Sequence, residues 1–205
     1  MAQTSSSVLD ELRAHLSGDT VNQISQKIGT DPQQTKAAID GAIPLLLAAL
    51  GKQAADPDRR TGLQQAILED HDGSVVDNLP AYLDGQLSGR ATDGQGIVNH
   101  VLGDRQQPAA QALAGKSGLD LSSIMSLLPL LAPIVMGMIG KKERSGNMSL
   151  DTITDVLGGD TRRAAGESPD IGDLLGSVLG GGQTGQGGQA SGGIGDVLGS
   201  IFGKR

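Results

Sequence analysis

Several residue types are absent or nearly absent from this chain of 205 residues. It has no cysteine and no tryptophan, and it has a single tyrosine, Tyr82, and a single phenylalanine, Phe202. Without cysteine, the chain forms no disulfide, thiolate nucleophile or cysteine-ligated metal site. An interior with so few aromatic rings must be filled by aliphatic side chains, which suits packing between helices better than a β-sandwich.

Alternating apolar and polar runs, which are typical of half-buried strands, are also lacking. Apolar residues recur at helical spacing instead, as Val8, Leu12 and Leu16 do. The chain has 32 glycines, and they are concentrated in its last third. We therefore expect an all-α protein with a helical domain over residues 5–160 and a Gly-rich, flexible tail over residues 161–205.

The net charge bears on which partners the protein binds, and the N-terminal sequence bears on its location in the cell. A formal net charge of −7 disfavours binding to nucleic acid or to an anionic membrane surface. The first residues, MAQTSSSVLDELRAHL, do not show a basic segment followed by an apolar one, so no secretory signal is predicted. We expect a cytoplasmic protein.

The most informative pattern is an internal repeat with a shift of 89 residues, which places residues 21–52 on residues 110–141. In each copy a glycine ends a short helix, an aspartate caps the next helix, and a proline is expected to kink or restart that helix. This pattern predicts two helix-turn-helix units packed as one helical domain. The coinciding pairs are Gly29 with Gly118, Asp31 with Asp120, Pro44 with Pro133, Gly51 with Gly140 and Lys52 with Lys141.

A shorter repeat occupies the last quarter of the chain. The sequences ITDVLGG (153–159), IGDLLGS (171–177) and IGDVLGS (194–200) are near copies. The last two predict short helices over 171–180 and 194–203, joined by a Gly-rich stretch with the composition of a flexible linker. Either the tail is disordered with residual helical character, or these segments dock into a groove. The candidate interaction residues are Leu174, Leu175, Leu179, Val197, Leu198 and Phe202.

Three segments carry a resemblance to a known family: TVNQISQKIGTDPQQTKAAIDGAIPLLLAALGK (20–52), GIVNHVLG (96–103) and SLLPLLAPIVMGMIGKK (126–142). Over roughly residues 5–160 the chain resembles the YidB-like bacterial family of unknown function, domain of unknown function 937. The resemblance implies an all-α, homeodomain-like arrangement in a bacterial cytosolic protein. It implies no reaction, supplies no catalytic residue and does not extend to the Gly-rich tail.

Patterns typical of enzymes are weak. The string AQALAGKS (110–117) partly matches a phosphate-binding loop, but it consists of helix formers and follows no strand, so it is interpreted as the end of a short helix. His71, among acidic residues, predicts a solvated helix end, and His100 predicts a partly buried structural side chain. No serine lies in a recognisable catalytic pattern. The sequence therefore predicts no catalytic residue, no cofactor and no metal site.

Two other functions stay open. The helix-turn-helix pattern also occurs in DNA-binding proteins, in which Gln33, Gln34 and Lys36 could contact bases, but the adjacent acidic residues and the scarcity of cations favour a structural packing unit. Residues 121–140 are an uncharged apolar run long enough to cross a membrane, but two prolines interrupt it, and its counterpart in the first repeat carries charges.

The sequence thus favours a non-enzymatic cytoplasmic protein that binds an unknown protein partner or associates with itself. A DNA-binding regulator is the first alternative, and a membrane-associated protein is the second.

Overall fold

The computed structural model describes residues 7–146 and 152–179, which lie mostly in helices. No β-strand occurs among these residues, and the all-α prediction is confirmed. The helices in chain order are α1 (Val8–His15), α2 (Asp19–Ile28), α3 (Pro32–Ala55), α4 (Pro57–Glu69), α5 (Ser74–Asp77), α6 (Leu79–Leu83), η1 (Arg90–Thr92), α7 (Gly94–Leu102), η2 (Gly103–Arg105), α8 (Gln106–Ser117), α9 (Leu121–Arg144), α10 (Ile153–Glu167) and α11 (Pro169–Leu179).

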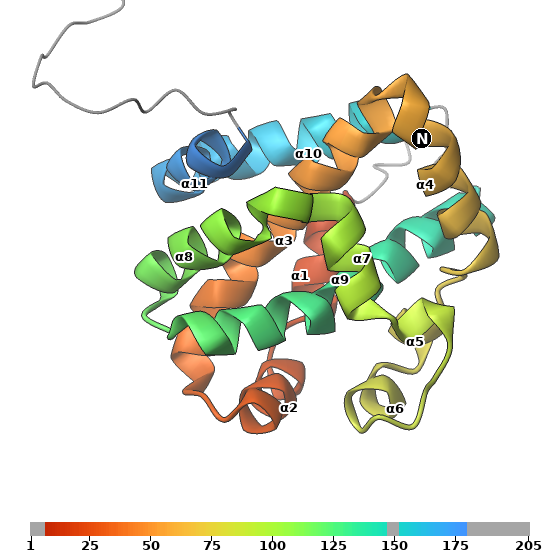
Figure 1. Cartoon of the computed structure of the whole chain (residues 1–205). Helices are drawn as coiled ribbons and strands as arrows, with labels where there is room; N and C mark the ends of the chain where they lie inside the picture. The colour runs from red at the N-terminus through yellow and green to blue at the C-terminus, as the bar shows by residue number, and fades with distance from the viewer. Residues whose placement is uncertain (1–6, 147–151, 180–205) are drawn as a thin grey trace, which may run out of the picture.

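Two helices of 24 residues each, α3 and α9, lie at the centre of the fold (Figure 1). Their middle segments are buried on every side, including the whole of residues 131–140 in α9. Helices α10, α8, α2 and α4 pack on α3, while α7, α8, α5 and α4 pack on α9. The apolar runs of the sequence therefore form one aliphatic interior.

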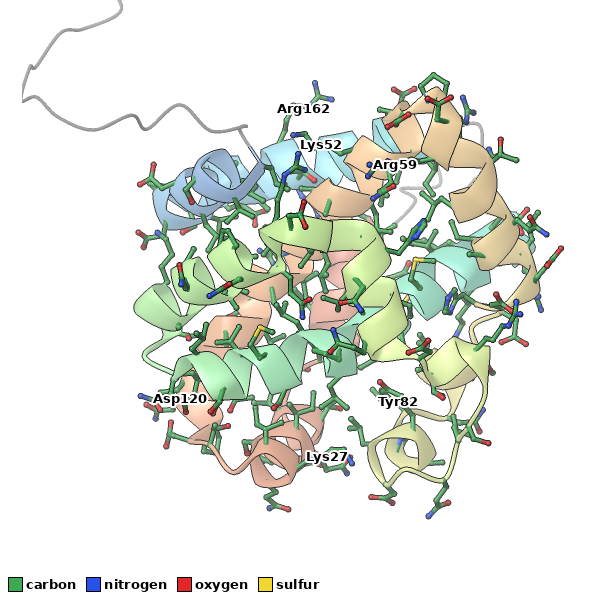
Figure 2. All side chains as sticks on the ribbon, in the orientation of Figure 1. Lys27, Lys52, Arg59, Tyr82, Asp120 and Arg162 are labelled. Atoms are coloured by element: carbon green, nitrogen blue, oxygen red, sulfur yellow. The ribbon has the colours of Figure 1, made fainter. Side chains whose placement is uncertain are left out.

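The two long helices begin in the same way. The helices before them, α2 and α8, end at Gly29 and Gly118, whose φ angles of 71° and 76° lie in the left-handed region that favours glycine. Asp31 then caps α3 by accepting the backbone N–H groups of Gln33 and Gln34. Asp120 caps α9 by accepting the backbone N–H of Ser123 (Figure 2). Local sequence thus sets both turns.

The prolines inside these helices do not restart them. Both α3 and α9 continue through Pro44 and Pro133. Because a proline has no N–H, the carbonyl of Pro129 loses its helical partner at Pro133. The first residue of α7, Gly94, fits against this carbonyl, and a Cβ atom there would lie only 1.7 Å from the oxygen.

The glycines at matched positions near the ends of α3 and α9 have different neighbours. A Cβ atom on Gly51 would lie 3.5 Å from Cβ of Leu157 in α10, which is an ordinary contact. A Cβ atom on Gly140 would lie 1.7 Å from the carbonyl oxygen of His71. Of these two matched glycines, only Gly140 is required by the close approach of another backbone.

The helical body extends past residue 160, because that position lies inside α10. The buried carboxylate of Asp160 accepts a 3.2 Å hydrogen bond from the backbone N–H of Leu9 in α1. Arg163 pairs with Asp10 at 2.8 Å, and Glu167 pairs with Arg13 at 2.7 Å. These contacts join α10 to α1, so the predicted boundary between domain and tail falls within a packed helix.

Among the described residues, α3 and α9 are long and apolar enough to cross a membrane. In the most apolar window of each helix, 72% and 78% of the residues are buried inside the protein. A core helix passes the same test of length and composition, so this feature is weak support for a membrane span. Lys142 near the end of α9 is also buried, and it pairs with Glu11 of α1 at 2.7 Å.

Replacing Gly140 with alanine should lower the free energy of unfolding by about 2–3 kcal/mol, because the new methyl group overlaps the His71 backbone. Gly115→Ala in α8 is the matched control, since nothing described lies within 4 Å of its Cβ position. That variant should be more stable than the parent by about 0.5–1 kcal/mol. Urea unfolding measures both changes, and equal stabilities for the two variants would contradict the packing at Gly140.

Candidate functional site: the α11 groove and two adjoining clefts

The segment 169–179, which contains the second tail repeat, is a helix docked on the body of the protein. We call the surface of α3 and α8 that α11 covers, beside α10, the α11 groove (Figure 1). Four side chains of α11 are at least 92% buried there: Leu174, Leu175, Val178 and Leu179. Three of the six candidate interaction residues thus pack into the chain's own core. The other three, Val197, Leu198 and Phe202, lie outside the described residues.

One polar contact holds each end of α11 in the groove. At its first turn, Asp170 pairs with Lys116 of α8 at 3.1 Å. At its last residue, the carbonyl of Leu179 accepts a hydrogen bond from the ammonium of Lys52 in α3. Because Asp170 is 83% exposed, its ion pair stabilises the docked helix only weakly. Burial of the apolar face is the main force that holds α11.

The N-terminal half of α11 packs incompletely. An open pocket of about 250 Å³ is lined by Ile171 and Gly41 of α3, and a second open pocket of about 440 Å³ is lined by Ile171, Leu16 and Lys36. Ile171 is only half-buried. Solvent can therefore reach this end of the interface, whereas the C-terminal half of α11 is packed against the body.

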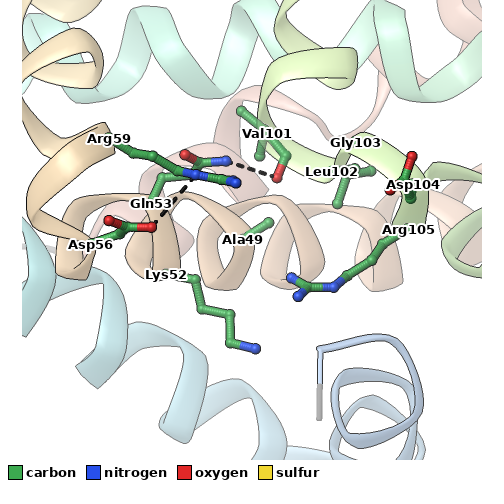
Figure 3. Close-up of a pocket in the computed structure, with 10 residues that line it drawn as sticks. All are labelled: Ala49, Lys52, Gln53, Asp56, Arg59, Val101, Leu102, Gly103, Asp104 and Arg105. Atoms are coloured by element: carbon green, nitrogen blue, oxygen red, sulfur yellow. Dashed lines mark hydrogen bonds and ion pairs between the residues drawn. The ribbon is translucent and has the colours of Figure 1, made fainter. Parts of the chain in front are cut away.

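A cleft of about 460 Å³ opens where α3 ends, α4 begins and α7 turns into η2 (Figure 3). We call it the cationic cleft, because Lys52, Arg59 and Arg105 line it together with two carboxylates, Asp56 and Asp104. Its apolar wall consists of Ala49, Val101 and Leu102.

Gln53 forms the floor of the cationic cleft and joins α3 to the end of α7. This side chain is 95% buried, and its amide N–H donates to the carbonyls of His100 at 2.8 Å and Val101 at 3.4 Å. Its Oε1 atom has no hydrogen-bond partner within the described ranges.

A second cleft, of about 390 Å³, lies between α4 and α7 over α9, and we call it the histidine cleft. His71 and His100 line it with Asp70, Arg90 and the apolar residues Leu63, Ile97 and Met136. The side chain of His71 is 95% buried, so the prediction of a solvated helix end is wrong there. His100 is exposed rather than partly buried. The residues next to His71 in the sequence do not indicate its burial. That burial depends on a distant residue, Gly140 of α9, which lets the His71 backbone approach closely.

The environment of His71 favours its neutral form. Burial lowers the pKa of His71 from its ordinary value near 6.5, although the carboxylates of Asp70 and Asp72 act in the opposite direction. Its Nδ1 atom has no hydrogen-bond partner among residues 7–146 and 152–179. Across the same residues, no group of three or more His, Asp and Glu side chains is placed to hold a metal ion.

The structure also shows the environment of the phosphate-loop-like string and of the three candidate DNA-contacting residues. The string 110–117 lies entirely within α8, as expected. On α3, Gln34 donates to the carbonyl of Gly118 at 3.2 Å, and Lys36 pairs with Asp40 at 2.6 Å. Gln33, beside them, is exposed.

The described residues form a small, all-helical fold. A sequence profile of the family described as bacterial protein of unknown function (DUF937) matches residues 10–142. Because this match covers more than half of the chain, the protein belongs to that family. A search with this chain found no match among the curated proteins and none among the solved structures. Helices α10 and α11 lie beyond the matched residues, so the α11 groove combines matched helices with an added segment.

Acidification should destabilise the protein through His71. Its ring stays neutral in the folded chain but takes up a proton in the unfolded chain once the pH falls below about 6.5. The unfolded state then binds more protons, so the free energy of unfolding should decrease as the pH falls from about 6.5 toward the lowered pKa. Urea unfolding at a series of pH values measures this slope. His71→Gln should flatten it, and an unchanged slope would show that His71 does not cause it.

Proposed function

We propose that this protein is a non-enzymatic bacterial cytoplasmic protein that associates with itself through its repeated tail segment. The docking of α11 carries the proposal, because it shows a copy of the repeat seated in a groove of the body. The occupant we propose for exchange is the segment 194–203 from a second copy of the chain.

The sequence of that segment supports the exchange. Residues 171–177 and 194–200 are identical at six of seven positions, with valine at 197 in place of leucine at 174. The same alignment places Ile201 on Val178 and Phe202 on Leu179, both of which are buried in the docked helix. A helix formed by this segment would therefore carry apolar residues at the positions that are buried in α11.

The energetics favour a weak, concentration-dependent association. A swapped segment forms nearly the same contacts as the one it displaces, so exchange costs little. Val197 loses one methylene relative to Leu174, whereas Ile201 and Phe202 add apolar surface, at about 0.8 kcal/mol per buried methylene. The 14-residue linker, 180–193, has a root-mean-square length of about 20 Å if it behaves as a Gly-rich coil. The tail segment can thus extend from its own chain to a neighbouring one.

We also propose that the two helix-turn-helix units arose by duplication and that each has a homeodomain-like arrangement. The left-handed glycines, the aspartate caps and the equal lengths of α3 and α9 support duplication. The DNA-binding alternative gains no support from α3, because Gln34 and Lys36 already bond within the protein. Self-association is therefore the function we favour.

Light scattering of the full chain over a range of concentrations tests the proposal. The mean mass should increase with concentration for the parent chain. The double variant Val197→Asp, Leu198→Asp should stay monomeric, because docking would bury two carboxylates without partners. The control, Gln183→Asp with Gln186→Asp, adds the same charge to the linker and should behave as the parent does. A parent chain that stays monomeric throughout, or a double variant that still associates, would overturn the proposal.

A further inference from the structure

Three cationic side chains from three separate elements line the cationic cleft. Lys52 comes from α3, Arg59 from α4 and Arg105 from η2. In Figure 3, Arg59 and Arg105 extend toward the space beside Ala49, whereas Lys52 extends from α3 toward the end of α11, where it donates to the carbonyl of Leu179. All three residues are exposed, so a ligand from solution has access to them. Like charges that face one another in a cleft repel, and an anion between them relieves that repulsion.

The carboxylates of the cleft leave much of this charge uncompensated. Asp56 caps α4 by accepting the N–H of Asp58 at 3.1 Å, and it lies 3.5 Å from Nε of Arg59, so the far end of that guanidinium stays open to the cleft. The carboxylate of Asp104 points away from the three cationic ends in Figure 3.

Two of the cations keep binding capacity for a ligand. Arg105 forms no ion pair with any residue that the structure describes. Lys52 donates one N–H to the carbonyl of Leu179, and its ammonium has two more to donate. A positive cleft in a chain of net charge −7 is a local feature, not a consequence of overall composition.

We propose that the cationic cleft binds a small soluble anion with two linked phosphate groups. A guanidinium presents a fork of N–H donors that matches paired phosphate oxygens, and a lysine adds a point charge. The cleft volume of about 460 Å³ lies within the range of small-molecule sites. Two guanidinium groups and one ammonium, held on separate elements, match the charge of a diphosphate better than that of a single phosphate.

The helix ends at the cleft offer a competing explanation for the cations. Helices α3 and α7 both end there, and carbonyls at helix C-termini attract positive side chains without any ligand. The test must therefore distinguish a site for an anion from simple neutralisation of the helix ends.

Isothermal titration of the full chain with inorganic pyrophosphate at low ionic strength provides that test. We expect saturable binding of one pyrophosphate per chain, tighter than the binding of inorganic phosphate. Arg105→Gln should weaken it by about tenfold to hundredfold, the usual effect of losing hydrogen bonds to a charged group. Arg90→Gln is the matched control: it removes the same charge from a side chain outside this cleft and should leave the affinity within about twofold.

Each other outcome overturns the proposal. Equal losses in Arg105→Gln and Arg90→Gln would indicate general electrostatic attraction, and no saturable binding would indicate that the cations only neutralise the helix ends. Binding to vesicles of anionic phospholipid without binding to pyrophosphate would assign the cleft to a membrane surface. Circular dichroism of the variants checks that each retains the helical fold.

Discussion

The burial of the apolar middle segments of two long helices is the constraint on which the rest of this structure depends. Helices α3 and α9 have few polar faces to present to water, so the other helices must cover them on all sides. Because the chain has only one tyrosine and one phenylalanine, the buried apolar area must come from many small contacts between aliphatic side chains. Close approach of backbones at Gly94 and Gly140 lets the covering elements reach the central helices.

Polar side chains then fix the covering elements through backbone groups more than through pairs of charges. The hydroxyl of Tyr82 donates to the carbonyl of Leu130 at 3.0 Å, which fastens α6 to α9, and burial raises the pKa of this hydroxyl well above its ordinary range. Gln53 does the same for the end of α7, and Asp160 caps α1 from α10. Such bonds are directional, so they select one arrangement among many that would bury a similar apolar area.

Features of the fold that depend on neighbouring residues in the sequence could be predicted, whereas those that depend on residues far apart in the sequence could not. The left-handed turns at Gly29 and Gly118 and the caps at Asp31 and Asp120 follow from local chemistry, and each is present. The burial of His71 depends on a helix almost 70 residues away, and no local pattern encodes that contact. The high glycine content near residue 160 concealed α10, whereas a short helix over 171–180 was predicted and its docking in a groove was one of two alternatives. The three cations of the cleft lie far apart in sequence and meet only through the fold.

The structure joins a helical domain of a bacterial family to an added segment that occupies one of its grooves. We interpret that segment as one of two rival occupants, and the α11 groove as the functional surface of the protein. Burial of the apolar face of α11 provides most of the docking energy.

Disulfide trapping tests this interpretation most directly, since the chain has no cysteine of its own. In the docked α11, Lys116 pairs with Asp170, and the repeat alignment places Gly193 at the position of Asp170. Chains carrying Lys116→Cys would be mixed with chains carrying Gly193→Cys under mild oxidation. Our account predicts a linked dimer that forms faster than the one between Gln65→Cys, exposed on α4, and Gly193→Cys. Equal rates for the two mixtures would contradict it.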